Sequence, residues 1–288
     1  MLFRSWLLKE LRWKKSGEEW QRQAEFAHNP IDRIRALDEL AKLERNEQFV
    51  PVFSRVMAQD TFWVVRREAI NQSEKIDLKD NALTAMLKDA LLLTAKDARK
   101  SAVRSAAAVQ LKRFRGDSMA IGALQTALED SSYDVLANVI RSLAKVDSSH
   151  VLPLLKKYLE YPSFRNRIHN AALNLLGPID SAQAVAIALT DAQYGHDVTT
   201  RFTSLGTLRK YGKEKPDVLA LYQSLLSDKD DGIRSNAART LGEIGEEPTI
   251  ATLERIANDK DNAASDTAKE SIEKIKKRVA GKKKESTH

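Results

Sequence analysis

The stretch DGIRSNAARTLGEIG, residues 231–245, combines an acidic start with a regular apolar period. Its apolar side chains recur every three or four residues, the spacing of one face of an α-helix; they are Ile233, Ala237, Ala238, Leu241 and Ile244. Asp231 precedes this face, and Arg234 follows its first apolar residue. Whether Arg234 binds a ligand or serves the fold depends on whether the pattern recurs in the chain.

The pattern apolar–Arg–x–x–Ala–apolar–x–x–Leu does recur. Close copies are VRREAINQS (65–73), VRSAAAVQL (103–111) and DRIRALDEL (32–40), and four looser copies keep the same register. The positions equivalent to Arg234, in chain order, are Arg33, Arg66, Arg104, Leu136, His169, Arg201, Arg234 and Ser265. Successive positions are 33, 38, 32, 33, 32, 33 and 31 residues apart, a register that chance does not maintain through eight units.

A second helical segment separates successive copies of the pattern. These segments have apolar residues at helical spacing, and they include residues 46–60, 150–161, 181–191, 217–228 and 248–259. Each unit is therefore a helix hairpin of about 30 to 40 residues that cannot bury its apolar faces alone, and stacking of neighbours closes the core. The sequence predicts an all-α fold, a right-handed α-solenoid of about eight helix hairpins.

The composition favours helices and excludes several kinds of chemistry. The chain of 288 residues is 42% hydrophobic and 30% charged, with 11 Gly and 7 Pro, values typical of a folded helical protein. It has no cysteine, which excludes disulfides, thiolate metal sites and a cysteine nucleophile and favours a reducing compartment such as the cytoplasm. No apolar run is long enough to cross a bilayer, so we expect a soluble protein without a membrane partner.

The repeated arginines are interpreted as parts of the structure. An acid lies within seven residues before the equivalent position in seven of the eight units; these acids are Asp32, Asp60, Asp97, Asp134, Asp197, Asp231 and Asp261. Such a carboxylate can cap the second helix, and the following arginine can bridge to the acid of a neighbouring repeat. His169 stands in an arginine's place, and we expect a hydrogen-bonded structural histidine there.

This signature, an acid and an apolar–Arg pair leading into an alanine-rich helix, resembles the HEAT-repeat family, especially its short-repeat form. The resemblance covers residues 18–278. It departs from the pattern at Leu136, His169 and Ser265, where the arginine is missing, and residues 77–98 include a few extra residues. The resemblance implies a helical scaffold with an extended curved face that is lined by the second helices.

The N-terminal residues carry a second resemblance, to the junction that follows the catalytic region of zinc aminopeptidases of the aminopeptidase-N type. The matching residues are Trp6–Leu8, Lys9, Lys15, Ser16, Glu18–Trp20, Asp32, Arg33 and Ala36. The predicted regions are a strand-like remnant of a preceding β module (residues 1–15), a HEAT-like repeat domain (16–278) and a basic, disordered tail (279–288). The chain then resembles the C-terminal helical region of such an enzyme.

The chemistry of that enzyme family would lie outside this chain. The family holds zinc with the motif H-E-x-x-H, in which two histidines share one helical face and the glutamate acts as base. None of the five histidines of this chain has that spacing. We therefore expect no catalytic residue, metal ligand or cofactor in this chain, and zinc would belong to an upstream catalytic domain.

The leading functional hypothesis is a noncatalytic scaffold that binds a protein or peptide along its curved face. As part of an aminopeptidase-like protein, it would shape access to the cleft or mediate assembly, and its partner could be the upstream catalytic module. Positions two and six residues beyond the apolar start of each copy should be exposed on that face. The predicted contact residues are Arg141, Asn170, Asn174, Phe202 and Arg239.

Two alternatives of different classes are open. A basic cluster in residues 96–115 could bind nucleic acid, with contacts expected at Lys100, Arg104, Lys112, Arg113 and Arg115. That hypothesis requires these cations to converge on one face and binding to weaken steeply with salt. A small enzyme that acts on its own is the third hypothesis, and the sequence offers no constellation of catalytic residues for it.

Overall fold

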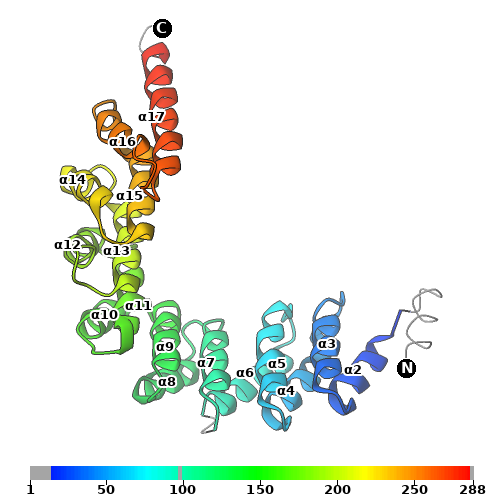
Figure 1. Cartoon of the computed structure of the whole chain (residues 1–288). Helices are drawn as coiled ribbons and strands as arrows, with labels where there is room; N and C mark the ends of the chain where they lie inside the picture. Colours follow the sequence, from blue (N-terminus) through cyan, green and yellow to red (C-terminus); the bar gives the residue numbers. More distant parts are fainter. Residues whose placement is uncertain (1–13, 97–98, 286–288) are drawn as a thin grey trace. The chain divides into compact units, whose positions relative to one another are not determined.

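The computed structural model describes residues 14–96 and 99–285, with side chains described through residue 281. These residues form helices and connecting turns, and none of the described residues is in a strand. The chain divides into two compact units, the first ending at Leu154 and the second beginning at Leu155. In each unit the helices alternate between a first and a second helix of a hairpin (Figure 1).

The first unit contains four hairpins among its described residues. They are α2 (Gly17–Phe26) with α3 (Pro30–Ala41), α4 (Val50–Gln59) with α5 (Trp63–Gln72), α6 (Asn81–Ala95) with α7 (Ser101–Leu111), and α8 (Ser118–Thr126) with α9 (Tyr133–Val146). The second helices contact one another in chain order, α3 with α5, α5 with α7 and α7 with α9. The longer α6 accounts for the spacing of 38 residues between Arg66 and Arg104.

The second unit continues the same alternation. Its helices are α10 (Val151–Leu159), within which the boundary falls, α11 (Arg167–Leu176), α12 (Ser181–Asp191), α13 (Val198–Tyr211), α14 (Pro216–Ser224), α15 (Asp231–Ile244), α16 (Thr249–Ala257) and α17 (Ser265–Glu285). Short 3-10 helices join some of these elements in both units: η1 (Asn46–Phe49), η2 (Ser73–Lys75), η3 (Ala127–Glu129), η4 (Ser148–His150), η5 (Phe164–Asn166) and η6 (Leu225–Ser227). The predicted all-α solenoid of stacked hairpins is confirmed.

Side-chain caps define where many of the helices begin. Ser16 accepts a hydrogen bond from the Glu19 amide at 3.2 Å, and the Glu19 carboxylate accepts one from the Ser16 amide at 2.8 Å, which forms a capping box at α2. Aspartates cap other helices through amides that lack a partner within the helix, as Asp197 does for α13 at 2.9 Å. The remaining aspartate caps are Asp80 at α6, Asp117 at α8, Asp180 at α12 and Asp230 at α15.

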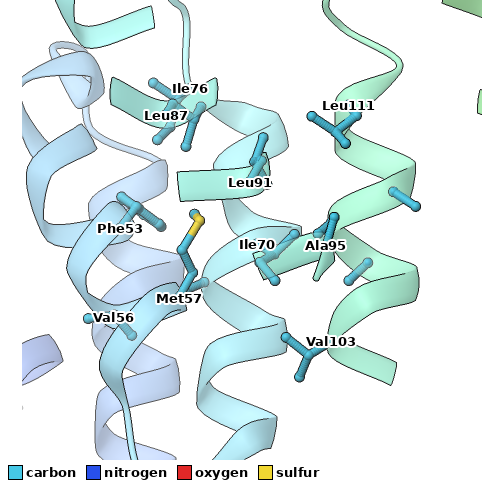
Figure 2. Close-up of a cluster of buried hydrophobic side chains, with 14 of the residues drawn as sticks. Phe53, Val56, Met57, Ile70, Ile76, Leu87, Leu91, Ala95, Val103 and Leu111 are labelled. Atoms are coloured by element: carbon cyan, nitrogen blue, oxygen red, sulfur yellow. The ribbon is translucent and has the colours of Figure 1, made fainter. Parts of the chain in front are cut away.

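One continuous apolar core runs through the first unit. Phe53 and Met57 of α4, Leu91 of α6 and Leu111 of α7 are completely buried, and they belong to one cluster that extends from α4 across α6 to α7 (Figure 2). Burying a side chain of this size contributes about 1.5–3 kcal/mol. Because the contacts join helices of successive hairpins, each hairpin depends on its neighbours for its core.

Two features of the structure bear on the predicted regions. Helix α17 continues through residue 285, whereas the sequence predicts a disordered tail from residue 279; alanine, lysine and glutamate dominate this stretch and favour helix. The single repeat domain predicted for residues 16–278 is divided between two units. The strand-like segment predicted for residues 1–15 lies almost entirely outside the described residues, and residues 14–16 precede α2 without regular structure.

Candidate functional site

The repeated arginines form a ladder of polar links between hairpins. Each link is called a rung here, and the repeat position of Arg234 and its equivalents is the rung position. In the first rung, the Arg33 guanidinium lies 2.8 Å (Nε) from one oxygen of Asp60 and donates to the other at 3.0 Å. The same guanidinium donates to the Ala27 carbonyl, at the end of α2, at 2.7 Å. Arg33 therefore ties the end of its own first helix to the turn of the next hairpin.

The partner acid of each rung also shapes the turn in which it lies. Asp60 Oδ1 accepts a hydrogen bond from the Phe62 amide at 2.8 Å in addition to the Arg33 guanidinium. Asp130 likewise binds the Ser132 amide at 2.8 Å, and Arg104 lies 2.6 Å from its carboxylate. Because one carboxylate organises the turn and receives the arginine, the rung fixes the position of one hairpin against the next.

Two rungs in the second unit show what happens when the partner changes. Arg201 binds the Asp228 carboxylate with two nitrogens and the Ala192 carbonyl at 3.0 Å, and only 4% of each charged side chain is exposed. The hydrogen bonds from Arg201 hold the pKa of Asp228 below its ordinary value despite burial. Across to the next hairpin Arg234 instead meets a neutral amide oxygen, that of Asn262, at 3.2 Å, and its ion pair is with Asp231 of its own helix at 2.5 Å.

His169 of α11 occupies the rung position of its hairpin. Its Nδ1 lies 2.6 Å from the Leu159 carbonyl oxygen, and its Nε2 lies 2.7 Å from Asp191 Oδ2. The hydrogen bond to Asp191 raises the pKa of His169 above its ordinary value, against burial, which lowers it. The predicted hydrogen-bonded histidine is confirmed.

The sequence predicts the function of the rung arginines correctly and most of their partners wrongly. Asp60 is the predicted acid of its turn, but Arg104 and Arg201 bind Asp130 and Asp228 rather than the predicted Asp134 and Asp231. The sequence does contain a signal for these partners. Asp60, Asp130 and Asp228 each lie six residues before the next rung position, two residues before the N-cap of that helix.

A groove crosses the second helices of the first unit. It has a volume of about 340 Å³. Its floor consists of five side chains of α7, most of them small: Ser101, Ala102, Ser105, Ala106 and Val109. Arg67 and Asn71 of α5 form one wall, and Asp134 and Asn138 of α9 form the other. The Asn138 amide donates to Ser105 Oγ at 2.7 Å, which holds α9 against α7.

The predicted contact residues lie in both units. Arg141 is exposed on α9 and donates to Asn138 Oδ1 at 2.9 Å, beside the groove of the first unit. Asn174 and Arg239 are exposed in the second unit, and Phe202 is 39% exposed. The Phe202 ring lies so close to Gly232 that a Cβ there would come within 3.0 Å of it.

The predicted exposure of Asn170 is wrong. Only 7% of this residue is exposed, and its amide nitrogen donates to the Arg165 carbonyl at 3.4 Å. Arg165 and Asn166 adopt the left-handed backbone conformation immediately before α11, with φ angles of 51° and 52°. This turn directs the start of α11 so that Asn170 faces inward, a local effect that the repeat pattern does not encode.

The basic cluster is largely used within the first unit. Arg104 pairs with Asp130, Lys112 lies 2.9 Å from Glu74, and Arg113 donates to the carbonyls of Ser73 and Ile76 at 2.8 and 2.9 Å. Lys100 and Arg115 are exposed. The five predicted nucleic-acid contacts therefore do not form one free cationic surface, because Arg104 and Arg113 bind protein groups.

Two further open cavities lie beside turns between first and second helices. One, of about 580 Å³, lies between Phe26 and Phe62 in the first unit; the other, of about 480 Å³, lies beside Tyr194 and Lys229 in the second. In the described part of the chain, histidine, aspartate and glutamate form no cluster of three that could hold a metal ion. None of the helices in that part combines the length and the apolarity needed to cross a bilayer.

Comparison with known proteins places the repeats in a family. The family model described as HEAT repeats matches residues 89–176 and 188–273. No curated protein matches the chain. Among solved structures, YibA from Escherichia coli has 17% identity and a TM-score of 0.57, with 91% of this chain and 93% of YibA covered.

A second solved structure, the complex of CpcE and CpcF of phycocyanin lyase from Nostoc sp. PCC7120, has 18% identity and a TM-score of 0.47. The likeness covers 84% of this chain and 93% of that chain. At such identities the likeness to YibA is one of fold. The family match covers more than half of the chain and includes the rungs of Arg104, His169, Arg201 and Arg234, and the chain belongs to the HEAT-repeat family.

Proposed function

We propose that the chain is a noncatalytic scaffold that binds a protein or peptide through the groove across α5, α7 and α9. The observation that carries this proposal is the groove itself, because its floor bears small side chains and its walls bear polar ones. Small side chains at Ala102 and Ala106 let a polypeptide backbone come close to α7. The amides of Asn71 and Asn138 can both donate and accept, as the N–H and C=O groups of a polypeptide require.

The rigidity of the groove supports the same proposal. Arg104 fixes α7 to the turn before α9 through Asp130, and Asn138 fixes α9 to α7 through Ser105. On the other wall, the Glu68 carboxylate accepts two hydrogen bonds from Arg67, at 3.2 and 2.9 Å. A site whose walls are already held in place loses less conformational entropy when a partner binds.

The test uses a display library of linear peptides, selected on the immobilised full-length chain. In the variant Ala102→Arg a long cation fills the groove, and we expect selected peptides to lose at least about tenfold in affinity, or about 1.4 kcal/mol. The matched control is Met119→Arg, which adds the same charge at an exposed position of α8 outside the groove. Circular dichroism of both variants checks that the helices remain. Peptides that bind wild type and Ala102→Arg equally would contradict the groove as the site.

We further propose that the scaffold belongs to an aminopeptidase-like protein, where it shapes access to the cleft or mediates assembly. The support is the resemblance of the N-terminal residues. The structure gives several of those residues a structural task, since Ser16 and Glu19 cap α2 and Arg33 forms a rung. The test is the coding sequence that precedes Met1: H-E-x-x-H in the same reading frame favours this assignment, and an in-frame stop codon excludes it.

The nucleic-acid alternative has less support, because it relies on cations that bind protein groups. Lys100 and Arg115 are the exposed members of its predicted set. Retention on a DNA column that falls steeply with salt, and that falls further in Lys100→Ala with Arg115→Ala, would favour it over peptide binding. We expect weak retention that these two substitutions leave unchanged.

A further inference from the structure

The rung at α11 differs from the arginine rungs in one chemical property. Guanidinium keeps its charge throughout the pH range in which proteins fold, so the rungs of Arg33, Arg104 and Arg201 are permanent. Imidazole gains or loses a proton near neutral pH. His169 therefore occupies a structural position with a group whose hydrogen-bonding capacity changes with pH.

Both ring nitrogens of His169 face groups that can only accept a hydrogen bond. Nδ1 faces the Leu159 carbonyl at 2.6 Å and Nε2 faces the Asp191 carboxylate at 2.7 Å. A neutral imidazole has one N–H and can satisfy one of the two acceptors, whereas an imidazolium satisfies both. The side chains of His169 and Asp191 are only 17% and 13% exposed, so water compensates poorly for a missing donor.

The position of Leu159 strengthens the preference for the charged ring. Leu159 is the last residue of α10, where helix carbonyls lack partners within the helix. Carbonyls at a helix C-terminus carry partial negative charge and favour a cation beside them. The imidazolium of His169 thus lies between a helix end and a carboxylate, and each stabilises its charge.

Asp191 is the charged group that acts on His169 in the described part of the second unit. Of the charged groups at the start of α13, Arg201 binds Asp228, and Asp197, the N-cap, accepts hydrogen bonds from the amides of its own helix. Arg165 of η5 lies over the Phe164 ring at 5.2 Å. The remaining ionisable side chains of α10, α11 and the turn between them are Lys156, Lys157, Tyr158, Glu160, Tyr161 and Arg167.

We propose that His169 is a proton-operated link between the hairpins α10–α11 and α12–α13. The link is closed when the ring carries two protons and donates to both Leu159 and Asp191. Loss of the Nε2 proton removes the bond to Asp191 and weakens the contact of α11 with α12, whereas loss of the Nδ1 proton removes the bond to Leu159 and weakens the contact of α11 with α10. The neighbouring rung of Arg201 keeps its charge, so the link from α12–α13 to the following hairpin stays closed.

The direction of the pH effect follows from the raised pKa of His169 in the folded chain. A group whose folded-state pKa exceeds its unfolded value stabilises the fold fully below the unfolded value, about 6.5 for histidine. That stabilisation is lost as pH rises through the folded-state pKa. The link is therefore closed below the ordinary pKa of histidine and opens as pH rises through the raised pKa of His169.

The experiment combines two readouts on the full-length chain. Nitrogen-15 spectra of the histidine ring follow its protonation, and site-resolved hydrogen exchange, corrected for intrinsic rates, follows the amides of α11 and α12. We expect both His169 nitrogens to have imidazolium shifts at about pH 6, a titration midpoint above about 6.5, and loss of α11–α12 protection through the same midpoint.

Three variants make the result specific. In His169→Arg the protection of the α11 and α12 amides against hydrogen exchange should not change with pH. In His169→Gln the same amides should show, at all pH values, the low protection that wild type has at high pH. His150→Gln is the matched control, because His150 also lies 2.9 Å from an aspartate, Asp147, but is 83% exposed and bonds within its own turn. A midpoint at or below about 6.5, or protection that does not follow it, overturns the proposal. If His169→Gln does not fold, the wild-type titration and His169→Arg still decide.

Discussion

Two adjacent rungs of the second unit, at Arg201 and His169, have the same architecture and different chemistry. Each side chain binds a carbonyl at the end of its own first helix, Ala192 or Leu159, and a carboxylate of the following hairpin. In both rungs a donor side chain links two acceptors, so this link does not require an arginine. The choice of cation decides whether the link between hairpins is permanent or depends on pH.

The largest effect is expected when an arginine rung is broken on one side. Arg201→Met leaves the Asp228 carboxylate buried without its cation, and such a loss costs about 3–5 kcal/mol of unfolding free energy. Urea denaturation measures this loss. The double variant Arg201→Met with Asp228→Asn should recover part of it, because the buried charge is then removed as well. If Arg201→Met lowers the free energy of unfolding by less than about 1 kcal/mol, the ion pair contributes no more than an ordinary surface ion pair, and the prediction is wrong.

The next largest effect is expected when the chemistry of the two rungs is exchanged. Arg201→His places an ionisable ring beside Asp228, and at high pH an acceptor loses its donor, at a cost of about 1–3 kcal/mol. The stability of this variant should fall as pH rises through the raised pKa of the new histidine, while His169→Arg should reduce the slope of the wild-type profile. Equal slopes for both variants and wild type would refute the comparison.

A smaller effect is expected at Arg234, because its partner in the next hairpin is neutral and its charged partner, Asp231, is 71% exposed. Arg234→Met removes the hydrogen bond to Asn262 but leaves no buried charge behind, since the Asn262 oxygen keeps its bond from the Ala264 amide at 3.0 Å. The expected cost is about 0.5–1.5 kcal/mol in the same urea measurement. A cost equal to that of Arg201→Met would show that the charge of the partner does not govern the strength of a rung.

The sequence predicts the repeat fold well because its signals are local. Apolar spacing places Ile233, Ala237 and Leu241 on one buried face of α15, and the small alanines let helices pack closely. The rung partners Asp130 and Asp228 are less predictable, because each arginine reaches into the next hairpin and several acids lie near every turn. Asn170 shows a further limit, since two left-handed residues before α11 change which side of that helix is buried.

The repeat pattern does not predict the groove of the first unit either. The predicted contact residue Arg141 lies beside it, but its lining depends on which side chains of α5, α7 and α9 meet. The alanine-rich stretch VRSAAAVQL (103–111) contributes Ser105, Ala106 and Val109 to the floor, so an unusual run of small residues was the available signal. Only the packed helices show that polar side chains border this run on both sides.

The central claim is that the rungs hold neighbouring hairpins together rather than single helices. Native-state hydrogen exchange of Arg201→Met tests it directly, because Arg201 joins the hairpin α12–α13 to the turn before α15. The account predicts that amides of α12, α13 and α15 lose protection together, by at least about a hundredfold. Loss of protection confined to the residues around position 201, with α15 unchanged, would contradict it.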